Sequence, residues 1–356
     1  MPTRHYAYNL SATRNVVPAL LIVAVACLAA GCDKIQIPEV GQQAAPAVAP
    51  VAPVAAPVQA PVEAPKAVTA PPPDPKAAVT AFLKKSKTEV LLDRDLVEIT
   101  SAEGAEGFEL VEELHLGGQG ITDEGVSRLS KFSKLNKLEL AGSKVTVAGL
   151  EVIKELPELQ FLGLNNTQTD DRIMSTIAAH PGIKELYLAS TAVTDVGLNE
   201  LEKLDDLEVL DITSTGITGA GFQRFKGHKH LRSLIAQRSG LQNEALKFLV
   251  GCPIEVLEID MSGVSDPGMI HVGKMKQLKR LSFGFSSISD AGIQKLGVMK
   301  DLEYVNARNC AMVSSLLFKK LMTCKKLTYV CVVGTRITAT DCANLKKLIP
   351  ACEIVK

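Results

Sequence analysis

The chain has no tryptophan, few aromatic residues of any kind and no net charge. Its 356 residues contain five Tyr and ten Phe, so aromatics make up only 4% of the composition. Hydrophobic residues still reach 46%, which is too many for a disordered chain and indicates a core of aliphatic side chains. Lys plus Arg and Asp plus Glu both number 39. This balance argues against a protein that coats DNA, because such binding needs a basic excess, and no nucleic-acid partner is expected.

Cysteines are also sparse, at eight in the whole chain, which is too few for a scaffold built from disulfides. No Cys-x-x-Cys pair occurs, so a zinc or thioredoxin-type site is not expected. Most of the later cysteines fall at positions of the repeat described below that we expect to be buried. We therefore expect free core thiols, with a disulfide near the C-terminal end as the alternative. Cys331 is an exception, since its position faces outward from the predicted sheet and leaves a reactive thiol open. These later cysteines are Cys252, Cys310, Cys324, Cys331, Cys342 and Cys352.

The start of the chain, from Met1 to Cys32, has the pattern of an export signal. Arg4, His5 and Arg14 precede an uncharged apolar run over 16–30, which is too short to span a bilayer comfortably. The run ends in Leu28-Ala-Ala-Gly-Cys32, which resembles the lipobox of bacterial lipoproteins, although Ala29 stands where leucine is usual. The alternative is ordinary secretion with cleavage nearby.

The lipobox resemblance implies that Cys32 carries the lipid and becomes the first residue of the mature chain. We then expect an exported lipoprotein anchored in the bacterial cell envelope, because buried acyl methylenes each add about 0.8 kcal/mol to membrane binding. Asp33 resembles an inner-membrane retention signal of some bacteria. Whether the inner or the outer membrane holds the protein stays open.

Residues 33–76 form a predicted linker of Ala, Pro and Val. Eleven of the eighteen prolines lie between 38 and 75. Proline lacks the backbone donor that helices and sheets need, so this segment favours an extended, semi-rigid spacer. At about 3.1 Å per residue, roughly 40 residues could reach about 120 Å. A docking site for a proline-binding partner is the alternative, but the segment lacks basic or aromatic flanks.

The remainder of the chain is one unit repeated about ten times. The period is about 24 residues, which is in the range of architectures that stack their repeats. The step after Leu231 is shorter than the others by one position, and the step after Leu302 is longer by one. In each repeat the first, fourth and sixth positions are apolar, as in Leu135, Leu138 and Leu140. The repeats begin at Val111, Leu135, Leu159, Ile183, Leu207, Leu231, Ile254, Leu278, Leu302 and Leu327.

The L-x-x-L-x-L pattern at this period resembles a leucine-rich repeat. The continuation Gly-Ile-Thr-Asp-Glu-Gly-Val at 120–126, which recurs in related form at 192–198 and 287–293, is similar to helix-bearing repeats of the ribonuclease-inhibitor-like, GALA and F-box-associated type. The resemblance implies an α/β leucine-rich-repeat solenoid over 111–350. A curved parallel sheet would line the concave face, and short helices would cover the convex face.

The hydrophobic pattern gives the same picture without the resemblance. Apolar positions four and six alternate with polar neighbours, which indicates a half-buried strand. A Thr/Ser-Asp pair then suits a helix N-cap, and apolar residues spaced three apart, such as Leu198, Leu201 and Leu204, form one helical face. The Ser and Thr residues at position nine, such as Thr191, are expected to satisfy turn backbone groups rather than act as nucleophiles.

The ends of a solenoid need covering. We expect an N-terminal cap over 77–110, made of a helix at 77–85 and short strands at 89–92 and 96–100. Residues 351–356 are expected to add a final cap strand.

No motif for catalysis or metal binding is found. His228 and His230 form a His-x-His pair that lacks a third ligand, and His228 and His180 fit a helix-end position where imidazoles meet carbonyls. The glycines at 117–120 lack the phosphate-loop ending. We therefore predict no enzyme, no catalytic residue, no metal, no cofactor and no small-molecule substrate.

The outward side chains of the concave sheet form the candidate binding face. Aromatic residues exposed on a rigid sheet are typical interface anchors, and two neighbouring pairs are expected. Three acidic residues between the pairs would favour a basic partner. The candidate residues are Phe161, Tyr187, Asp211, Glu258, Asp260, Arg280, Tyr304, Arg308 and Tyr329.

These features predict a membrane-anchored protein that binds a protein or another macromolecule through its concave face. One alternative is a passive structural lipoprotein of the envelope. Another, from the repeat resemblance alone, is an F-box-like substrate receptor of a ubiquitin ligase. The segment before the repeats is too short for an F-box bundle, and an export address would place the chain in the wrong compartment.

Overall fold

The computed structural model describes residues 79–82, 84–85, 91–101, 106–297 and 299–356. All of them belong to one compact unit, Thr69–Lys356. The predicted signal peptide, the lipid-attachment residue Cys32 and the predicted linker 33–76 lie outside the described residues.

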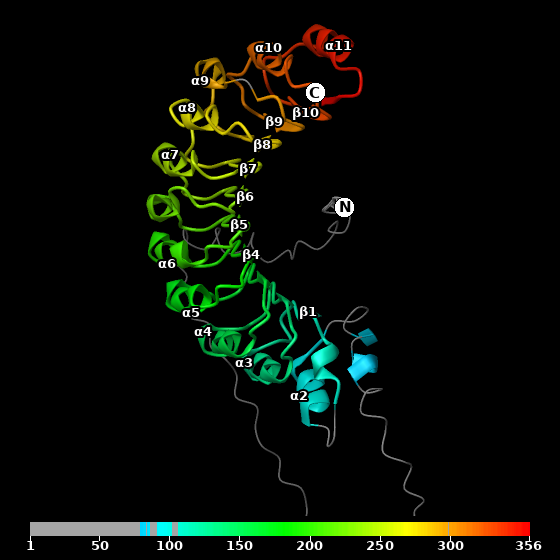
Figure 1. The fold of residues 1–356 in the computed structure, drawn as a ribbon. Helices are drawn as coiled ribbons and strands as arrows, with labels where there is room; N and C mark the ends of the chain where they lie inside the picture. Colours follow the sequence, from blue (N-terminus) through cyan, green and yellow to red (C-terminus); the bar gives the residue numbers. More distant parts are fainter. Residues whose placement is uncertain (1–78, 83, 86–90, 102–105, 298) are drawn as a thin grey trace, which may run out of the picture. The chain divides into compact units, whose positions relative to one another are not determined.

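The repeats build a single parallel sheet of eleven short strands, which follow one another in sequence order (Figure 1). Neighbouring strands pair in the register that the repeat spacing predicts, for example Leu138 beside Leu162 and Leu162 beside Leu186. The strands are β1 (Glu113–His115), β2 (Lys137–Glu139), β3 (Phe161–Gly163), β4 (Glu185–Tyr187), β5 (Val209–Asp211), β6 (Ser233–Ile235), β7 (Val256–Glu258), β8 (Arg280–Ser282), β9 (Tyr304–Asn306), β10 (Tyr329–Cys331) and β11 (Glu353–Val355).

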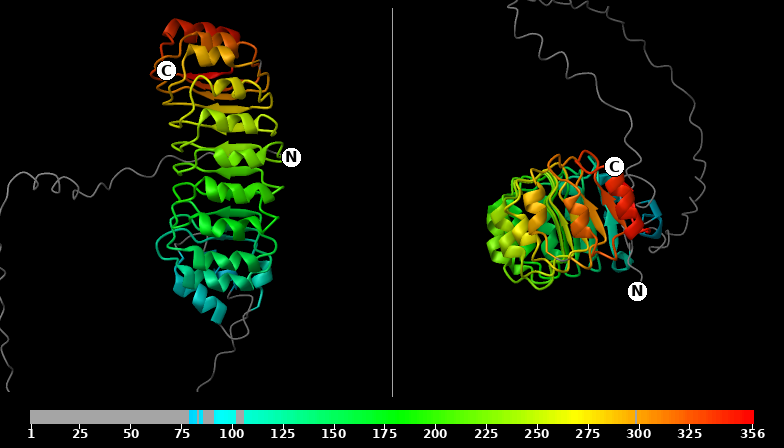
Figure 2. Two further views of the ribbon diagram at one scale, coloured as in Figure 1. Left: turned by 90° about the vertical axis from the view of Figure 1, so that its left-hand side faces the viewer. Right: turned by 90° about the horizontal axis from the view of Figure 1, so that it is seen from above.

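Short helices form a second layer on the outer side of the arc, while the strands line its inner side (Figures 1 and 2). The α-helices are α2 (Asp93–Ser101), α3 (Asp123–Val126), α4 (Val147–Leu150), α5 (Met174–Ala178), α6 (Asp195–Glu200), α7 (Leu246–Leu249), α8 (Met269–Val272), α9 (Asp290–Lys295), α10 (Leu316–Leu321) and α11 (Ala339–Leu348). Turns of 3₁₀ helix complete this layer at Phe108–Leu110, Ser127–Lys131, Glu151–Glu155, Asp171–Ile173, Leu201–Lys203, Ala220–Phe225 and Asn243–Ala245. None of the helices in the described residues combines the length and apolarity needed to cross a bilayer.

The core lies between the two layers and is continuous from repeat to repeat. The central residue of each strand from β1 to β10 is fully or almost fully buried, as are the apolar residues of the helices, such as Leu198 and Leu201. The predicted α/β leucine-rich-repeat solenoid is therefore confirmed. Each repeat buries its apolar face only by stacking on its neighbours.

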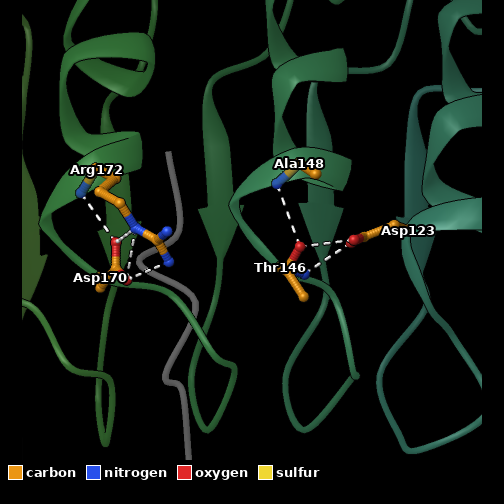
Figure 3. A network of polar contacts seen from close by, with 5 residues as sticks. All are labelled: Asp123, Thr146, Ala148, Asp170 and Arg172. Carbon is orange, nitrogen blue, oxygen red and sulfur yellow. Dashed lines mark hydrogen bonds and ion pairs between the residues drawn. The ribbon is translucent and has the colours of Figure 1, made fainter.

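A ladder of carboxylates links the starts of successive helices. The Asp123 carboxylate accepts hydrogen bonds from the backbone N–H and the hydroxyl of Thr146, at 2.7 and 2.6 Å. The Thr146 hydroxyl in turn accepts the N–H of Ala148 and so caps its own helix α4 (Figure 3). The same arrangement joins Asp171 to Thr194, and Asp266 to Ser289. The Thr of each predicted N-cap pair thus acts within its repeat, and the Asp acts between repeats.

Where the ladder is broken, both of its partners have changed. Val147 replaces the carboxylate in α4, and the next repeat has Asp170 in place of the hydroxyl. Asp170 instead caps its own turn and pairs with Arg172 (Figure 3). Gly219 and Gln242 show the same joint replacement three repeats further on. A carboxylate at position 147 would place two like charges together with Asp170, which explains the joint change at this break.

The Ser and Thr residues at position nine of the repeats satisfy backbone groups of the turns, as predicted. The hydroxyls of Thr167, Thr191 and Thr215 each donate to a carbonyl three residues earlier. His180 and His228 each contact a backbone oxygen with Nε2, but that oxygen belongs to the preceding repeat, at Leu156 and Leu204. The six cysteines of the described residues are free, and five of them are buried.

The N-terminal end differs from the prediction. Residues 79–82 and 84–85 are helical, but the strand predicted at 96–100 is wrong, because these residues belong to helix α2. Leu96, Ile99 and Thr100 are buried at a helical spacing of three and four. The Asp95 side chain accepts the N–H of Leu92, which favours a helix start.

Candidate binding site on the concave face

The strands present the predicted site residues on the concave side because the residue between them in each strand is buried. Phe161, Arg280, Tyr304 and Tyr329 start their strands and are half-buried, with Leu162, Leu281, Val305 and Val330 directly beneath in the core. Tyr187 and Glu258 end their strands in the same half-buried state. The structure thereby sets two aromatic pairs on either side of a polar centre.

The first pair lies on strands β3 and β4. The rings of Phe161 and Tyr187 are tilted, with centroids 5.0 Å apart. The Lys137 ammonium lies 4.7 Å from the Phe161 centroid, close enough for a cation–π contact. The Tyr187 hydroxyl donates to Glu185 at 2.9 Å. The pair is therefore fixed in place by its own neighbours.

The second pair is part of a longer stack on strands β8, β9 and β10. Tyr304 and Tyr329 are parallel within 5°, with centroids 4.8 Å apart. The Arg280 guanidinium lies 3.5 Å from the Tyr304 centroid and also forms an ion pair with Glu258. Burial raises the pKa of the Tyr304 phenol, so its hydroxyl remains protonated and able to donate at neutral pH.

The three acidic residues between the pairs form contacts within the domain that their sequence positions do not reveal. Glu258 pairs with Arg280 and accepts a hydrogen bond from Gln237. Asp211 is 8% exposed and accepts the N–H of Thr213, and burial raises its pKa. Glu258 is thus compensated by a cation within the sheet, and Asp211 is largely withdrawn from solvent.

Asp260 is the most constrained of the acidic residues. It is 8% exposed, and its Oδ1 accepts the N–H of Gly284 at 2.8 Å and the side-chain amide of Asn306 at 3.0 Å. Its Oδ2 is buried with no hydrogen-bond partner among the described residues. Burial raises the pKa of this carboxyl. Through Oδ1, Asp260 links the turn after β7 to the turn after β8 and to strand β9 at the polar centre.

A recess of about 380 Å³ opens at this centre, between the turns that follow β5 and strand β9. Four predicted residues line it: Glu258, Asp260, Arg280 and Tyr304. Phe161, Tyr187, Asp211, Arg308 and Tyr329 lie outside its lining. The remaining lining residues are Thr213, Ser214, Gln237, Arg238, Met261, Ser282, Phe285 and Asn306.

Two of the residues missed by the sequence analysis form an apolar rim. Met261 and Phe285 are 38% and 46% exposed, among the few large hydrophobic residues of the described chain that face solvent. Both have a left-handed backbone, with φ of 54° and 56°. This conformation costs bulky residues about 1–3 kcal/mol.

The left-handed positions of Met261 and Phe285 recur at the equivalent place in all ten repeats and together form one column. In each repeat the residue three positions after the end of the strand has positive φ. In the first nine repeats the backbone N–H of this residue donates to a carbonyl of the next repeat, as Asn166 does to Ala189. Glycine and asparagine, which suit this conformation, and the small residue serine fill most of the column. Bulky residues occupy it in three successive repeats, and all three line the recess. The column reads Gly118, Gly142, Asn166, Ser190, Ser214, Arg238, Met261, Phe285, Asn309 and Gly334.

The described residues contain no group of three or more His, Cys, Asp or Glu placed to hold a metal ion. Cys331, which the sequence left open as a reactive thiol, is 5% exposed. The recess offers charged, hydrogen-bonding and apolar groups side by side, which suits the binding of a mixed surface.

No family model matches the sequence, and no curated protein matches it either. Among solved structures, the chain is similar to an internalin (inlF) of Listeria monocytogenes, at 16% identity and a TM-score of 0.47, with 79% of this chain and 94% of that one covered. It is also similar to a leucine-rich-repeat protein of Leptospira interrogans, at 15% identity, a TM-score of 0.45 and coverage of 75% and 81%. A third similarity is to the yeast Rad7 and Elc1 complex, at 14% identity, a TM-score of 0.45 and coverage of 79% and 81%.

Proposed function

We propose that this chain is a non-enzymatic, membrane-anchored recognition protein that binds another protein through the concave face of its leucine-rich-repeat domain. The binding centre is the recess between β5 and β9. The lipid on Cys32 is the proposed anchor in the bacterial cell envelope, and the Ala/Pro segment is the proposed spacer between membrane and domain.

The observation that carries this proposal is the apolar rim of Met261 and Phe285. A folded chain gains nothing from exposing two large hydrophobic side chains in a costly backbone conformation. The cost is understandable if the side chains become buried on binding, because such anchors commonly contribute about 2 kcal/mol to an interface. Strain at a binding surface is a recurring feature of functional sites.

The polar centre adds oriented hydrogen-bonding groups to this apolar contact. The Arg280–Tyr304–Tyr329 stack is already ordered, so little side-chain entropy is lost when a partner packs against it. The Tyr304 hydroxyl and the outer atoms of Glu258 and Arg280 provide hydrogen-bonding groups beside the rim. A partner segment with one apolar side chain flanked by polar groups fits this arrangement.

A photoreactive amino acid at Gln237, a half-buried residue in the recess lining, tests the proposal in the source cells. We expect a saturable crosslink to one protein, with yield reduced at least tenfold by Tyr304→Ala or Phe285→Ala. Phe248→Ala, which removes a ring from the helix layer, is the matched control and should leave the yield unchanged. The same probe at Asn199, exposed on α6, reports background.

A passive envelope component would give a different result. Crosslinks would then be equally frequent from positions 237 and 199, or would be unaffected by the two recess variants. Either result contradicts recognition through the concave face.

A further inference from the structure

The solenoid has a second surface that the concave site does not use. In each repeat the end of the helix and the turn into the next strand lie on the same flank of the arc (Figure 2). On repeats five to nine these segments contain fourteen Lys and Arg but only three Asp and Glu. We call this surface the basic flank; it comprises residues 223–232, 247–255, 271–279, 295–297, 299–303 and 319–328.

The corresponding segments of repeats one to four differ sharply. Residues 127–136, 151–160, 175–184 and 199–208 contain six Lys and Arg and eight Asp and Glu. The zero net charge of the chain therefore conceals a flank whose C-terminal half is strongly positive. Charge segregated in this way indicates attraction to an anionic surface.

Many of the cations on the basic flank are not occupied by internal partners. Glu255 pairs with both Arg232 and Lys279, and Asp301 pairs with Lys326. By contrast, Lys226, Lys229, Lys274, Lys319 and Lys325 are exposed, and none forms an ion pair with another described residue. Their charge is available to an external ligand.

The flank also has a recess of its own, which has a clear structural cause. The step from Leu231 to Ile254 is one residue shorter than its neighbours, so the turn at Gly251–Pro253 falls short of the turns on either side. A cavity of about 360 Å³ results, and Lys229 from the repeat before and Lys274 and Lys276 from the repeat after line it. A shortened turn between two basic turns leaves space for an anionic group beside these three lysines, of which Lys276 also donates its ammonium to the Gly273 carbonyl.

We propose that the basic flank docks the domain on the anionic headgroups of a lipid bilayer. The flank of an arc presents the turns of many repeats side by side, so it suits an extended surface better than a small ligand. This inference draws on the proposed membrane address, because a spacer that reaches about 120 Å when extended would keep the flank within reach of the bilayer that holds the anchor. The concave face stays open in this orientation, since flank and sheet are different faces.

Vesicle co-sedimentation of the full chain with Cys32→Ser, which can carry no acyl group, tests the flank without a lipid anchor. We compare vesicles of phosphatidylcholine alone with vesicles that contain phosphatidylglycerol. The expected result is stronger binding to the anionic vesicles, weakened by raising salt. The triple variant Lys226→Glu, Lys229→Glu and Lys274→Glu should lose roughly a hundredfold or more of that preference, since each cation near a membrane contributes about 1 kcal/mol.

The matched control reverses three exposed cations outside the helix-end segments, Arg94→Glu, Lys144→Glu and Arg336→Glu, with the same change in net charge. It should retain most of the anionic preference. Equal binding to both vesicle types, an equal loss in the two triple variants, or binding of a DNA duplex without binding of vesicles would each overturn the proposal. None of these outcomes depends on the concave-face crosslink or on acylation of Cys32, so the proposals fail separately.

Discussion

At the residue scale, the concave recess depends on side chains that occupy unfavourable backbone positions. Phe285 has φ of 56° and is 46% exposed, and it follows Arg238 and Met261 in the same left-handed column. The other seven positions of that column are held by Gly, Asn or Ser. The three exceptions are adjacent and all line the recess.

Phe285→Asn should therefore separate folding from binding. We expect the free energy of unfolding, measured in urea, to rise by about 1 kcal/mol, because Asn tolerates a left-handed backbone. The crosslink from position 237 should weaken at least tenfold, because the apolar anchor is lost.

The reverse change, Asn309→Phe, is the control, since Asn309 has φ of 57° outside the recess. It should destabilise the fold and leave the crosslink unchanged. If Phe285→Asn left the crosslink intact, Phe285 would have no part in recognition.

The sequence identified part of this site. Alternation along the strands correctly predicts that Arg280, Tyr304 and Glu258 face the concave side. It does not show that Asp260 turns toward Gly284 and Asn306, because those partners lie one and two repeats away. A signal for Met261 and Phe285 was present, since bulky residues interrupt a column of Gly, Asn and Ser. Its meaning depends on φ, which the hydrophobic pattern does not contain.

At the scale of the element, the sequence predicts the strands and helices of the repeats well. A buried position at every second residue indicates a strand, and a buried position at every third residue indicates a helix. The ladder between helices was not predicted. A Thr-Asp pair looks like two caps for one helix, and only the stacking distance brings Asp123 to Thr146 of the next repeat. The prediction of a strand at 96–100, within helix α2, is wrong because this segment precedes the repeats and its residues have no column to fix their period.

The ladder predicts a large loss from Asp171→Ala. This carboxylate accepts hydrogen bonds from Thr194 N, Thr194 Oγ1 and Gly197 N at 2.8, 2.6 and 3.1 Å. Removing it leaves three donors without their acceptor, so we expect the free energy of unfolding to fall by about 2–4 kcal/mol in urea denaturation.

Asp205→Ala removes an exposed carboxylate of the same charge and should change stability by less than about 0.5 kcal/mol. Thr194→Val combined with Asp171→Ala should cost less than the sum of the two single changes, because both remove the same contact. Additive effects would show that the ladder does not couple adjacent repeats.

At the scale of the whole molecule, net charge is a poor guide to the surface. Equal numbers of acids and bases correctly describe the chain but not the basic flank, which forms only when segments from successive repeats are stacked on one side of the arc. The same stacking makes the concave sheet and the flank separate faces. One molecule therefore has room for a partner and for a membrane together.

Membrane attachment then has two proposed components that respond differently to salt. Acyl chains on Cys32 would hold through the hydrophobic effect, at about 0.8 kcal/mol per buried methylene, whereas the basic flank acts through charge. In 1 M salt the screening length falls to about 3 Å, so only the acyl anchor should persist.

We expect intact-mass analysis to show a mature chain that begins at an acylated Cys32, and we expect that chain to remain in the membrane fraction after a salt wash. Cys27→Ala, which alters a cysteine ahead of the proposed cleavage point, should behave like the parent chain, while Cys32→Ala should yield no acylated product. An unmodified N-terminus together with full release by salt would leave charge as the sole attachment and would rule out the lipid anchor.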